Sequence, residues 1–381
     1  MTKPSFNLAI LTDHIANIGG AESILFNAVA LFPHADLFTT VHKSEIDAKL
    51  PPYIARKGFE TTFLQHLPWP EKLYKAYLPL MPMAVEGLNL QAYDVLLSSH
   101  HSMIKGVIPR PDATHLCYCH SPARYIWDQF WTYASMNRLG PLGSLLVGAL
   151  SSPLRQWDAV SANRVDRFLA NSSFTAKRIQ KYYNRQAEVL FPPVDTQKFA
   201  HAAGQLVQSD DYYLMAGRLV AYKGFELAIE VFNALKQPLH IIGLGPEYER
   251  LKAMAGPTVK LLGRVDDATL TEQFQRCKGF IFPGKEDFGI VMVEAQAAGK
   301  PVIALEAGGA LDIVVPEQTG ILAPEYTLEA FKAAVEAANR CQWDAEAIAR
   351  HAQQFDTQVF RDRLECLVTQ AASSTSQSLR L

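Results

Sequence analysis

The second half of the chain alternates short apolar runs with longer runs of helical periodicity, and this alternation limits the possible folds more than any other feature. Strands that alternate with helices of such lengths predict a parallel sheet covered by helices on both faces. The expected strands are Tyr212–Met215, Leu239–Ile242, Val259–Leu262, Phe280–Phe282 and Val302–Ala304, and the expected helices are Phe225–Lys236, Glu247–Met254, Thr269–Arg276 and Val291–Ala298.

The first half also alternates strand-like and helical runs, but less regularly. Its expected strands are Leu8–Leu11, Leu37–Thr40, Val95–Ser98, His115–Tyr118, Phe168–Ala170 and Val189–Phe191, with a helix over Ser23–Leu31. A chain of 381 residues is too long for one compact core, so we expect an α/β protein with two domains. Pro192-Pro193 breaks the chain, and we place the domains at residues 1–195 and 196–360. Residues 361–381 are expected to be a C-terminal helix and a tail that is disordered from residue 372.

Composition narrows the class of partner and the compartment. A net charge of −2 argues against nucleic acid as a general partner. The five cysteines are scattered, as in a cytoplasmic protein with reduced thiols. Cys117 and Cys119 are too close for a usual zinc loop, and a buried strand explains them better. No signal-peptide pattern and no apolar run of 18 residues is present, so we expect a cytoplasmic protein.

Glycine or charged residues follow four of the expected strands in the second half. These loops contain Gly217-Arg218, Gly243-Leu244-Gly245, Gly263-Arg264 and Glu286-Asp287-Phe288-Gly289. Ligands of open parallel sheets bind beyond the carboxyl ends of the strands, where these four loops would meet. The sequence therefore predicts a ligand site at this edge.

Glu286 and Glu294 stand on either side of a predicted helix start. Gly289 lies just before that helix and allows a ligand to approach the backbone, while the first free N–H groups and the helix dipole attract an anion. Such a site suits a diphosphate, with the two carboxylates available to sugar hydroxyls. The alternative interpretation is that both glutamates are solvated or capping residues.

Two cations are predicted to reach the same edge. Arg218 leaves a strand end, and Lys223 follows five residues later, just before a helix. Cations aimed at a diphosphate leaving group would stabilise its developing charge; the alternative is a pair of solvated loop cations. Gly19-Gly20 opens a helix in the first half and makes a second N-terminus of suitable size for a phosphate.

These motifs together resemble the retaining glycosyltransferases of family 4. The resemblance rests on Gly-Arg-Leu-x3-Lys-Gly at 217–224 and Glu-Asp-Phe-Gly-Ile-x3-Glu-Ala at 286–295, and it extends over nearly the whole chain. Further matches are Gly19-Gly20-Ala21-Glu22, Ser98-Ser99-His100, Lys105-Gly106, Tyr118-Cys119-His120-Ser121-Pro122, Arg124-Tyr125-x-Trp127-Asp128, Ala170-Asn171-Ser172 and Pro192-Pro193-Val194-Asp195. The family implies the GT-B fold, in which two Rossmann-like doubly wound domains face each other across a cleft.

The resemblance also implies roles for the residues that bind the donor. Glu294 would hold the ribose hydroxyls of a nucleotide, and Glu286 would contact the hydroxyls of the transferred sugar. Arg218 and Lys223 would bind the diphosphate. The backbone amides of Gly289, Ile290 and Val291 would support the diphosphate or the sugar.

Further roles follow from the same resemblance. Gly19 and Gly20 would let the first-domain loop approach the phosphate, and His120 would lie near the sugar. Arg264 and Val265 would contact the base. No Asp-x-Asp motif is present, so no metal or other cofactor is expected.

The implied reaction is hexosyl transfer from a nucleotide diphosphate sugar, with GDP-mannose as the first choice. The acceptor would be a lipid-linked or glycan acceptor in surface polysaccharide or glycolipid synthesis. The alternatives are an inactive nucleotide-sugar-binding protein, or a transferase that uses UDP-glucose or UDP-N-acetylglucosamine.

Two stretches of the first half leave a choice open. Residues 63–90 mix aromatic side chains with prolines and lysines, and residues 139–155 begin with an uncharged Gly/Leu/Val-rich run. Either stretch is compatible with peripheral contact at the cytoplasmic face of the inner membrane. The alternatives are a buried helix or a wall of the acceptor site.

Overall fold

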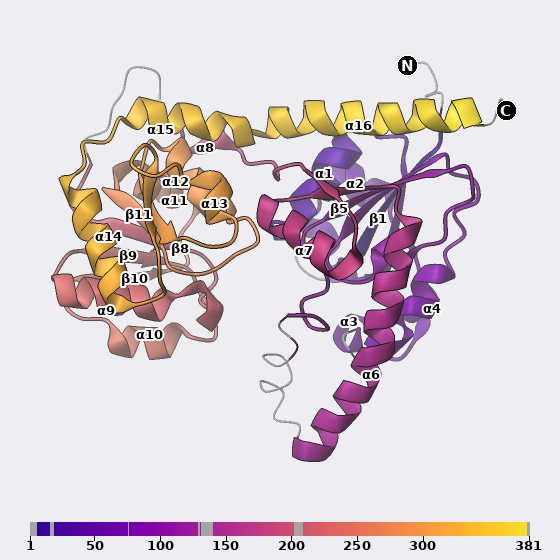
Figure 1. The fold of residues 1–381 in the computed structure, drawn as a ribbon, viewed down its shortest axis with the longest axis horizontal. Helices are drawn as coiled ribbons and strands as arrows, with labels where there is room; N and C mark the ends of the chain where they lie inside the picture. The colour runs from indigo at the N-terminus through magenta and orange to yellow at the C-terminus, as the bar shows by residue number, and fades with distance from the viewer. Residues whose placement is uncertain are drawn as a thin grey trace. The chain divides into compact units, whose positions relative to one another are not determined.

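The chain folds into two compact units (Figure 1). The computed structural model describes residues 6–15, 19–74, 76–128, 130, 140–201 and 209–378, and for 140–150 and 376–378 the backbone alone. Unit 1 consists of residues 1–191 together with 360–381, and unit 2 consists of residues 192–359. The first change of unit, at residues 191–192, lies close to the boundary we placed at residue 195, but the prediction did not assign residues 360–381 to unit 1.

Unit 1 is built on a parallel sheet. Its strands are β1 (Leu8–Ile15), β2 (Asp36–His42), β3 (Glu60–Thr61), β4 (Val95–His100), β5 (Thr114–Cys119), β6 (Arg167–Ala170) and β7 (Ala187–Val189). Its helices are α1 (Glu22–Leu31), α2 (Pro52–Lys57), α3 (Pro70–Leu73), α4 (Met81–Glu86), α6 (Gly140–Ser161), α7 (Ser173–Tyr183) and most of α16 (Thr357–Ser378). The sheet order β3-β2-β1-β4-β5-β6-β7, with parallel pairs throughout, reverses direction between β1 and β4 as in Rossmann folds.

The two faces of this sheet carry separate cores. Along β1, Leu8 and Ile10 join one buried cluster, whereas Ala9 and Leu11 join the other. Successive side chains of a strand point to opposite faces, so a continuous apolar run covers both. This is why the strand reads as unbroken hydrophobic sequence.

Helix α16 completes unit 1 from the far end of the chain. Its residues Phe360, Leu364, Leu367 and Val368 recur at helical spacing and are buried in the same cluster as Leu8. The helix lies along the sheet and α1 side of the unit in Figure 1.

The expected disorder from residue 372 is wrong as far as Ser378. The helix continues, because Ala372 and Thr375 extend its buried face. The hydroxyl of Thr375 lies 3.0 Å from that of Thr114 at the start of β5. Small buried residues thus anchor a segment whose composition is typical of a loose tail.

A buried ion pair joins α6 to the loop after β4 within unit 1. Lys105 follows β4, and its Nζ lies 2.8 Å from Asp158 Oδ1 on α6, with both side chains fully buried. Lys105 Nζ also donates to Ser161 Oγ at 2.9 Å. Asp158 Oδ2 accepts from Trp127 Nε1 at 2.7 Å and from the Tyr183 hydroxyl at 2.9 Å. This network could not be predicted from the sequence, because Lys105, Asp158 and Tyr183 are far apart in the chain.

The stretch 63–90 folds as short helical pieces instead of one long helix. Leu64 and Val85 are buried, whereas the side chains of Trp69 and Met83 are 71% and 59% exposed. The stretch 139–155 lies partly outside the described residues, and its described backbone belongs to α6. No helix in the described ranges is long and apolar enough to span a bilayer.

Unit 2 is a second parallel sheet with helices. Its strands are β8 (Tyr213–Ala216), β9 (Leu239–Ile242), β10 (Val259–Gly263), β11 (Gly279–Phe282), β12 (Val302–Leu305) and β13 (Gly320–Ala323). Its helices are α8 (Thr196–Phe199), α9 (Phe225–Leu235), α10 (Tyr248–Met254), α11 (Asp267–Arg276), α12 (Ile290–Ala297), α13 (Ala310–Ile313), α14 (Leu328–Arg340) and α15 (Ala345–Ala352). The order β10-β9-β8-β11-β12-β13 is that of the Rossmann fold, and all its pairs are parallel.

The predicted parallel α/β architecture is confirmed in both units. Each strand and helix expected in the second half is present, with ends that agree to within two residues. The sequence prediction missed β13, an edge strand in which Ile321 and Leu322 are only half-buried, and the helices α13, α14 and α15.

Candidate functional site

Four loops of unit 2 end at one edge of its sheet. They follow β8, β9, β10 and β11, and because these strands are parallel, their carboxyl ends lie together. The order of the sheet reverses between β8 and β11, which is where ligands bind in such folds. The predicted grouping of the Gly-rich and charged loops is thus present within unit 2.

The backbones of these loops touch one another. A Cβ on Gly243 would lie 1.9 Å from the carbonyl oxygen of Gly217, and a Cβ on Gly284 would lie 2.6 Å from the carbonyl oxygen of Lys223. Gly217 has φ +144° and Gly243 has φ +139°, which side chains disfavour. Only glycine allows the loops after β8, β9 and β11 to pack this closely.

Lys223 and Glu286 form an ion pair in this edge. Lys223 Nζ lies 2.9 Å from Glu286 Oε1, and the two side chains are only 13% and 19% exposed. The nearest acid in sequence, Glu226, instead pairs with Arg250 at 2.9 Å. The sequence placed the lysine and the carboxylate at one site but did not predict that they would neutralise each other.

Arg218 is exposed at the same edge. No ion pair or hydrogen bond joins its guanidinium to the described part of the chain. Arg264 is likewise exposed after β10, and Val265 beside it is half-buried. Arg218 therefore offers a planar cation to an incoming anion without first breaking an internal bond.

Helix α12 points its start into the region of Glu286. Gly289 has φ +99° and precedes the helix, which has no side-chain cap. The N–H groups of the first turn, from Ile290 and Val291 onward, stay available to an anion. The positive φ of Gly289 favours glycine at this start, whereas a Cβ there would meet only the movable end of the Met292 side chain.

Glu294 lies one turn inside α12 and is half-buried. Its carboxyl makes no hydrogen bond or ion pair to the described residues. Burial raises its pKa to about 7, the charges of Lys198 and Lys223 oppose the rise, and Asp267 adds to it. A poorly solvated carboxyl with open acceptor positions is suited to bind hydroxyl groups.

The two adjacent acids at the start of α11 have different contacts. Asp266 Oδ1 accepts from the N–H of Thr269 at 2.8 Å and caps α11. Asp267 instead pairs with Lys198 Nζ at 3.2 Å.

In unit 1, Gly19 and Gly20 are exposed before α1. The N–H of Gly19 donates to Glu22 Oε2 at 2.7 Å, and the Ser23 hydroxyl donates to the carbonyl of Gly20 at 2.6 Å. A phosphate at this helix start would compete with the Glu22 carboxylate, which the sequence prediction did not consider.

His120 ends β5 in unit 1. Its ring Nε2 lies 2.9 Å from the Ser99 hydroxyl, and its backbone N–H donates to the carbonyl of His100 at 2.8 Å. Burial and, secondly, the neighbouring His101 lower its pKa to about 3. The ring is therefore neutral at physiological pH and acts through hydrogen bonds.

Sequence reasoning missed Asp13, which supports the loop after β4. Its buried carboxylate accepts the backbone N–H groups of residues 101–104 at 2.6–2.8 Å. Burial would raise its pKa, but His101, His100 and these bonds prevail and lower it. In the sequence, the only feature that could have indicated this role is the position of Asp13 directly after an apolar run.

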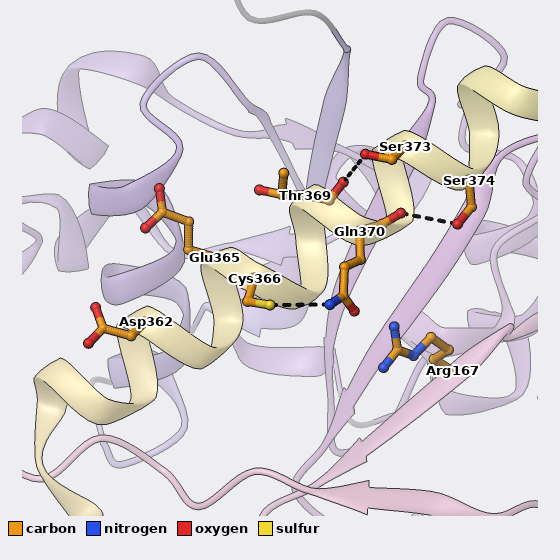
Figure 2. A pocket seen from close by; sticks show the side chains of 8 residues that line it. All are labelled: Arg167, Asp362, Glu365, Cys366, Thr369, Gln370, Ser373 and Ser374. Carbon is orange, nitrogen blue, oxygen red and sulfur yellow. Dashed lines mark hydrogen bonds between the residues drawn. The ribbon is translucent and has the colours of Figure 1, made fainter.

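A separate hollow of about 770 Å³ lies along α16 in unit 1 (Figure 2). Its lining residues are Arg167, Asp362, Glu365, Cys366, Thr369, Gln370, Ser373 and Ser374. Arg167 begins β6, so the hollow is at the amino edge of the sheet, opposite to His120. It contains none of the residues predicted from the sequence.

Residues 196–355 match the family described as glycosyl transferases group 1. The chain is 29% identical over 218 residues to D-rhamnosyltransferase WbpZ of Pseudomonas aeruginosa, covering 51% of this chain and 56% of that protein. It is 25% identical over 211 residues to O-antigen chain mannosyltransferase C of Escherichia coli, covering 52% and 55%. The chain thus spans about half the length of these curated relatives.

The fold matches solved structures over nearly the whole chain. The complex of Anabaena Alr3699/HepE with UDP and glucose superposes with a TM-score of 0.66 at 17% identity, covering 96% of this chain and 99% of the other. This likeness shows that the two units are those of the GT-B fold.

Proposed function

We propose, on the premise that residues 196–355 are a group 1 glycosyl transferase domain, that this chain transfers a hexose from a nucleotide diphosphate sugar. One observation carries the proposal. The Lys223–Glu286 ion pair, Arg218, the start of α12 and Glu294 all belong to the edge of one sheet in unit 2. They supply the cations, N–H donors and carboxylates that a diphosphate between two sugars requires.

The donor roles follow from this chemistry. Glu294 accepts hydrogen bonds from the ribose hydroxyls, and Glu286 accepts them from the transferred hexose. Arg218 and Lys223 bind the diphosphate together with the N–H groups of Gly289, Ile290 and Val291. Arg264 and Val265 contact the base. His120 and the Gly19-Gly20 loop belong to unit 1, and their parts in the reaction remain predictions.

The proposed reaction is a substitution at the anomeric carbon. The bond between that carbon and the diphosphate breaks, and the electron pair leaves with the diphosphate. Arg218, Lys223 and the α12 N–H groups stabilise the added charge. The acceptor hydroxyl bonds to the anomeric carbon on the same face, and a donor phosphate oxygen takes its proton, so the configuration is retained. No metal is required in this scheme.

Mannose from GDP-mannose is the proposed donor, since the relatives named above transfer mannose and rhamnose. The proposed acceptor is a lipid-linked or glycan acceptor of surface polysaccharide or glycolipid synthesis. Peripheral contact with a membrane belongs to the same proposal, supported by the exposed Trp69 and Met83. A UDP-sugar donor, and an inactive binding protein, are the alternatives.

The unfolding temperature measured in the presence of GDP, UDP or ADP identifies the base that the protein binds. A nucleotide at about 100 times its Kd stabilises by about 2.7 kcal/mol, which raises the midpoint of a unit of this size by roughly 5–10 °C. If UDP alone stabilised the protein, the proposed donor would be a UDP-sugar instead of GDP-mannose. Binding without turnover of any donor would favour the inactive protein.

Two variants test the assignment of the carboxylates. Glu294→Ala is expected to weaken nucleotide binding by about tenfold or more, because a hydrogen-bonding charged group is lost. Glu286→Ala is expected to leave nucleotide affinity within a few-fold and to lower turnover. Exposed Glu272 on α11 provides the control, Glu272→Ala. Wild-type transfer rates in both variants would refute the proposed site.

A further inference from the structure

Two histidines lie at the point where the sheet of unit 1 reverses its order. His14 is near the carboxyl end of β1, and His101 directly follows β4, the neighbouring strand. Both side chains are half-buried, and their ring centres are 5.1 Å apart. Ligands of open parallel sheets bind at such a reversal, beyond the carboxyl ends of the strands. Neither histidine has a part in the donor site proposed for unit 2.

Two further rings extend this pair. Tyr74, directly after α3, has its ring centre 4.6 Å from that of His14, and His120, directly after β5, has its ring centre 6.3 Å from that of His101. All four side chains are half-buried. We call these four rings the ring row. A ligand that touched them would meet ring faces and ring nitrogens together.

The carboxylate of Asp13 orients one ring of the row. Asp13 is buried, and its Oδ2 accepts the N–H groups of His101 and Ser102 at 2.7 and 2.8 Å. The same oxygen lies 3.4 Å from Nδ1 of the His101 ring. A carboxylate in this position favours the proton on Nδ1 and leaves Nε2 as a hydrogen-bond acceptor. Nε2 makes no hydrogen bond to the described part of the chain, and the side chain is 33% exposed, so a ligand can reach it.

The charges of unit 1 limit what the row can bind. The lysines that follow β2 and β4 are already paired, Lys43 with Glu45 at 2.7 Å and Lys105 with Asp158 at 2.8 Å. The Glu22 carboxylate likewise occupies the start of α1. The row thus offers acceptor nitrogens and ring faces, where the edge of unit 2 offers cations. A neutral ligand with hydroxyl donors and apolar C–H faces, such as a pyranose ring, fits this chemistry better than a phosphate.

We propose that the ring row binds a glycosyl group of the acceptor, and that Nε2 of His101 accepts a hydrogen bond from one of its hydroxyls. The identification of this ligand as the acceptor rests on the proposed function, in which unit 2 holds the donor. His14 contributes a ring face beside that nitrogen. Asp13 is a positioning residue, because it acts through the ring of His101. The hydrogen bond to His101 holds the acceptor and takes no part in the bond changes at the anomeric carbon.

The first test determines the tautomer of His101 without any ligand. Nitrogen NMR of the imidazole groups is recorded on the full-length chain at about pH 8, well above the reference pKa of histidine. The signals of His101 are assigned by their loss in His101→Gln. The proton is expected on Nδ1, and in Asp13→Asn it is expected to move in part to Nε2, which a merely structural role of Asp13 would not require. A proton on Nε2 in the wild type overturns the proposal.

The second test measures sugar binding in the absence of nucleotide. Saturation-transfer NMR is recorded on the full-length chain with methyl α-D-mannopyranoside, methyl α-D-glucopyranoside and N-acetylglucosamine. At least one of these sugars is expected to bind, and His101→Ala to weaken its binding by about fivefold or more, because one hydrogen bond is lost. His14→Ala is expected to weaken it as well, and His101→Gln to retain part of the affinity. His66→Ala, which alters an exposed histidine of the same unit, is the control and is expected to bind as the wild type does.

Several outcomes would contradict the proposal. Absence of binding by all three sugars overturns it, as does wild-type affinity in both His101→Ala and His14→Ala. Inorganic phosphate that displaces the sugar would identify an anion site instead. The nucleotide Kd is expected to be unchanged in these variants, and a fall in His101→Ala would assign that histidine to the donor. A wild-type chain that binds no nucleotide contradicts the proposed function, whereas the sugar measurements decide the role of the ring row separately.

Discussion

The buried ion pair between Lys105 and Asp158 provides a quantitative test of how unit 1 is held together. In Lys105→Met, the Asp158 carboxylate keeps the Trp127 indole and the Tyr183 hydroxyl as donors, at 2.7 and 2.9 Å, but loses its cation at 2.8 Å. Removing one member of a buried pair costs about 3–5 kcal/mol, because the other is left as an uncompensated charge. The buried Asp158 carboxylate would therefore be less stable in Lys105→Met than it is in the ion pair.

The expected result is a large fall in the unfolding temperature of unit 1. A unit of this size shifts by about 2–4 °C per kcal/mol, so the loss corresponds to about 6–20 °C. Calorimetry of the full-length chain gives the measurement, with the transition of unit 1 identified as the one that a nucleotide bound to unit 2 does not raise.

Two further variants test whether the loss of stability comes from the unpaired buried charge. Lys105→Met combined with Asp158→Asn removes both charges and is expected to recover part of the stability, because no buried charge is left unpaired. Lys43→Met breaks an exposed pair with Glu45 and is expected to leave the midpoint almost unchanged. If Lys105→Met unfolded at the wild-type temperature, the stabilising role of the pair would be refuted.

Two more predictions concern the diphosphate. Arg218→Lys is expected to raise the donor KM or lower kcat, since an ammonium cannot replace the two parallel hydrogen bonds of a guanidinium; steady-state kinetics equal to those of the wild type would show that Arg218 does not bind the diphosphate in this way. Transfer is expected to persist after dialysis against excess EDTA, because Arg218, Lys223 and the start of α12 supply the positive charge; activity lost in EDTA and restored by Mn²⁺ or Mg²⁺ would reopen the search for metal ligands with Asp266, Asp267 and Asp287.

The fold of unit 2 could be predicted because its strands are buried on both faces. Such strands appear as continuous apolar runs, as in Phe280–Phe282, which forms the last three residues of β11. The positions of the Gly and charged loops then follow from the parallel order alone. β13 is no shorter than β9, but it is an edge strand marked by only two large apolar residues, Ile321 and Leu322, which are half-buried.

Long-range pairing could not be predicted from local patterns. Nothing near Lys223 in the sequence indicates that Glu286 neutralises it, and nothing near Asp13 indicates that it holds the loop at residues 101–104. The pKa of Glu294 likewise depends on Lys198 and Asp267, and their distance from Glu294 in the sequence gives no sign of this. The sequence identified residue types and loops, whereas the contacts that determine their charge come from the fold.

The place of α16 has a consequence for how the protein is made. Residues 360–378 complete the core of unit 1, yet they are synthesised after all of unit 2. During translation, unit 2 therefore has its whole sequence available before unit 1 does. The cluster around Leu8 and Ile10 stays incomplete until the last helix leaves the ribosome, so nascent unit 1 presents an apolar surface that a chaperone would recognise.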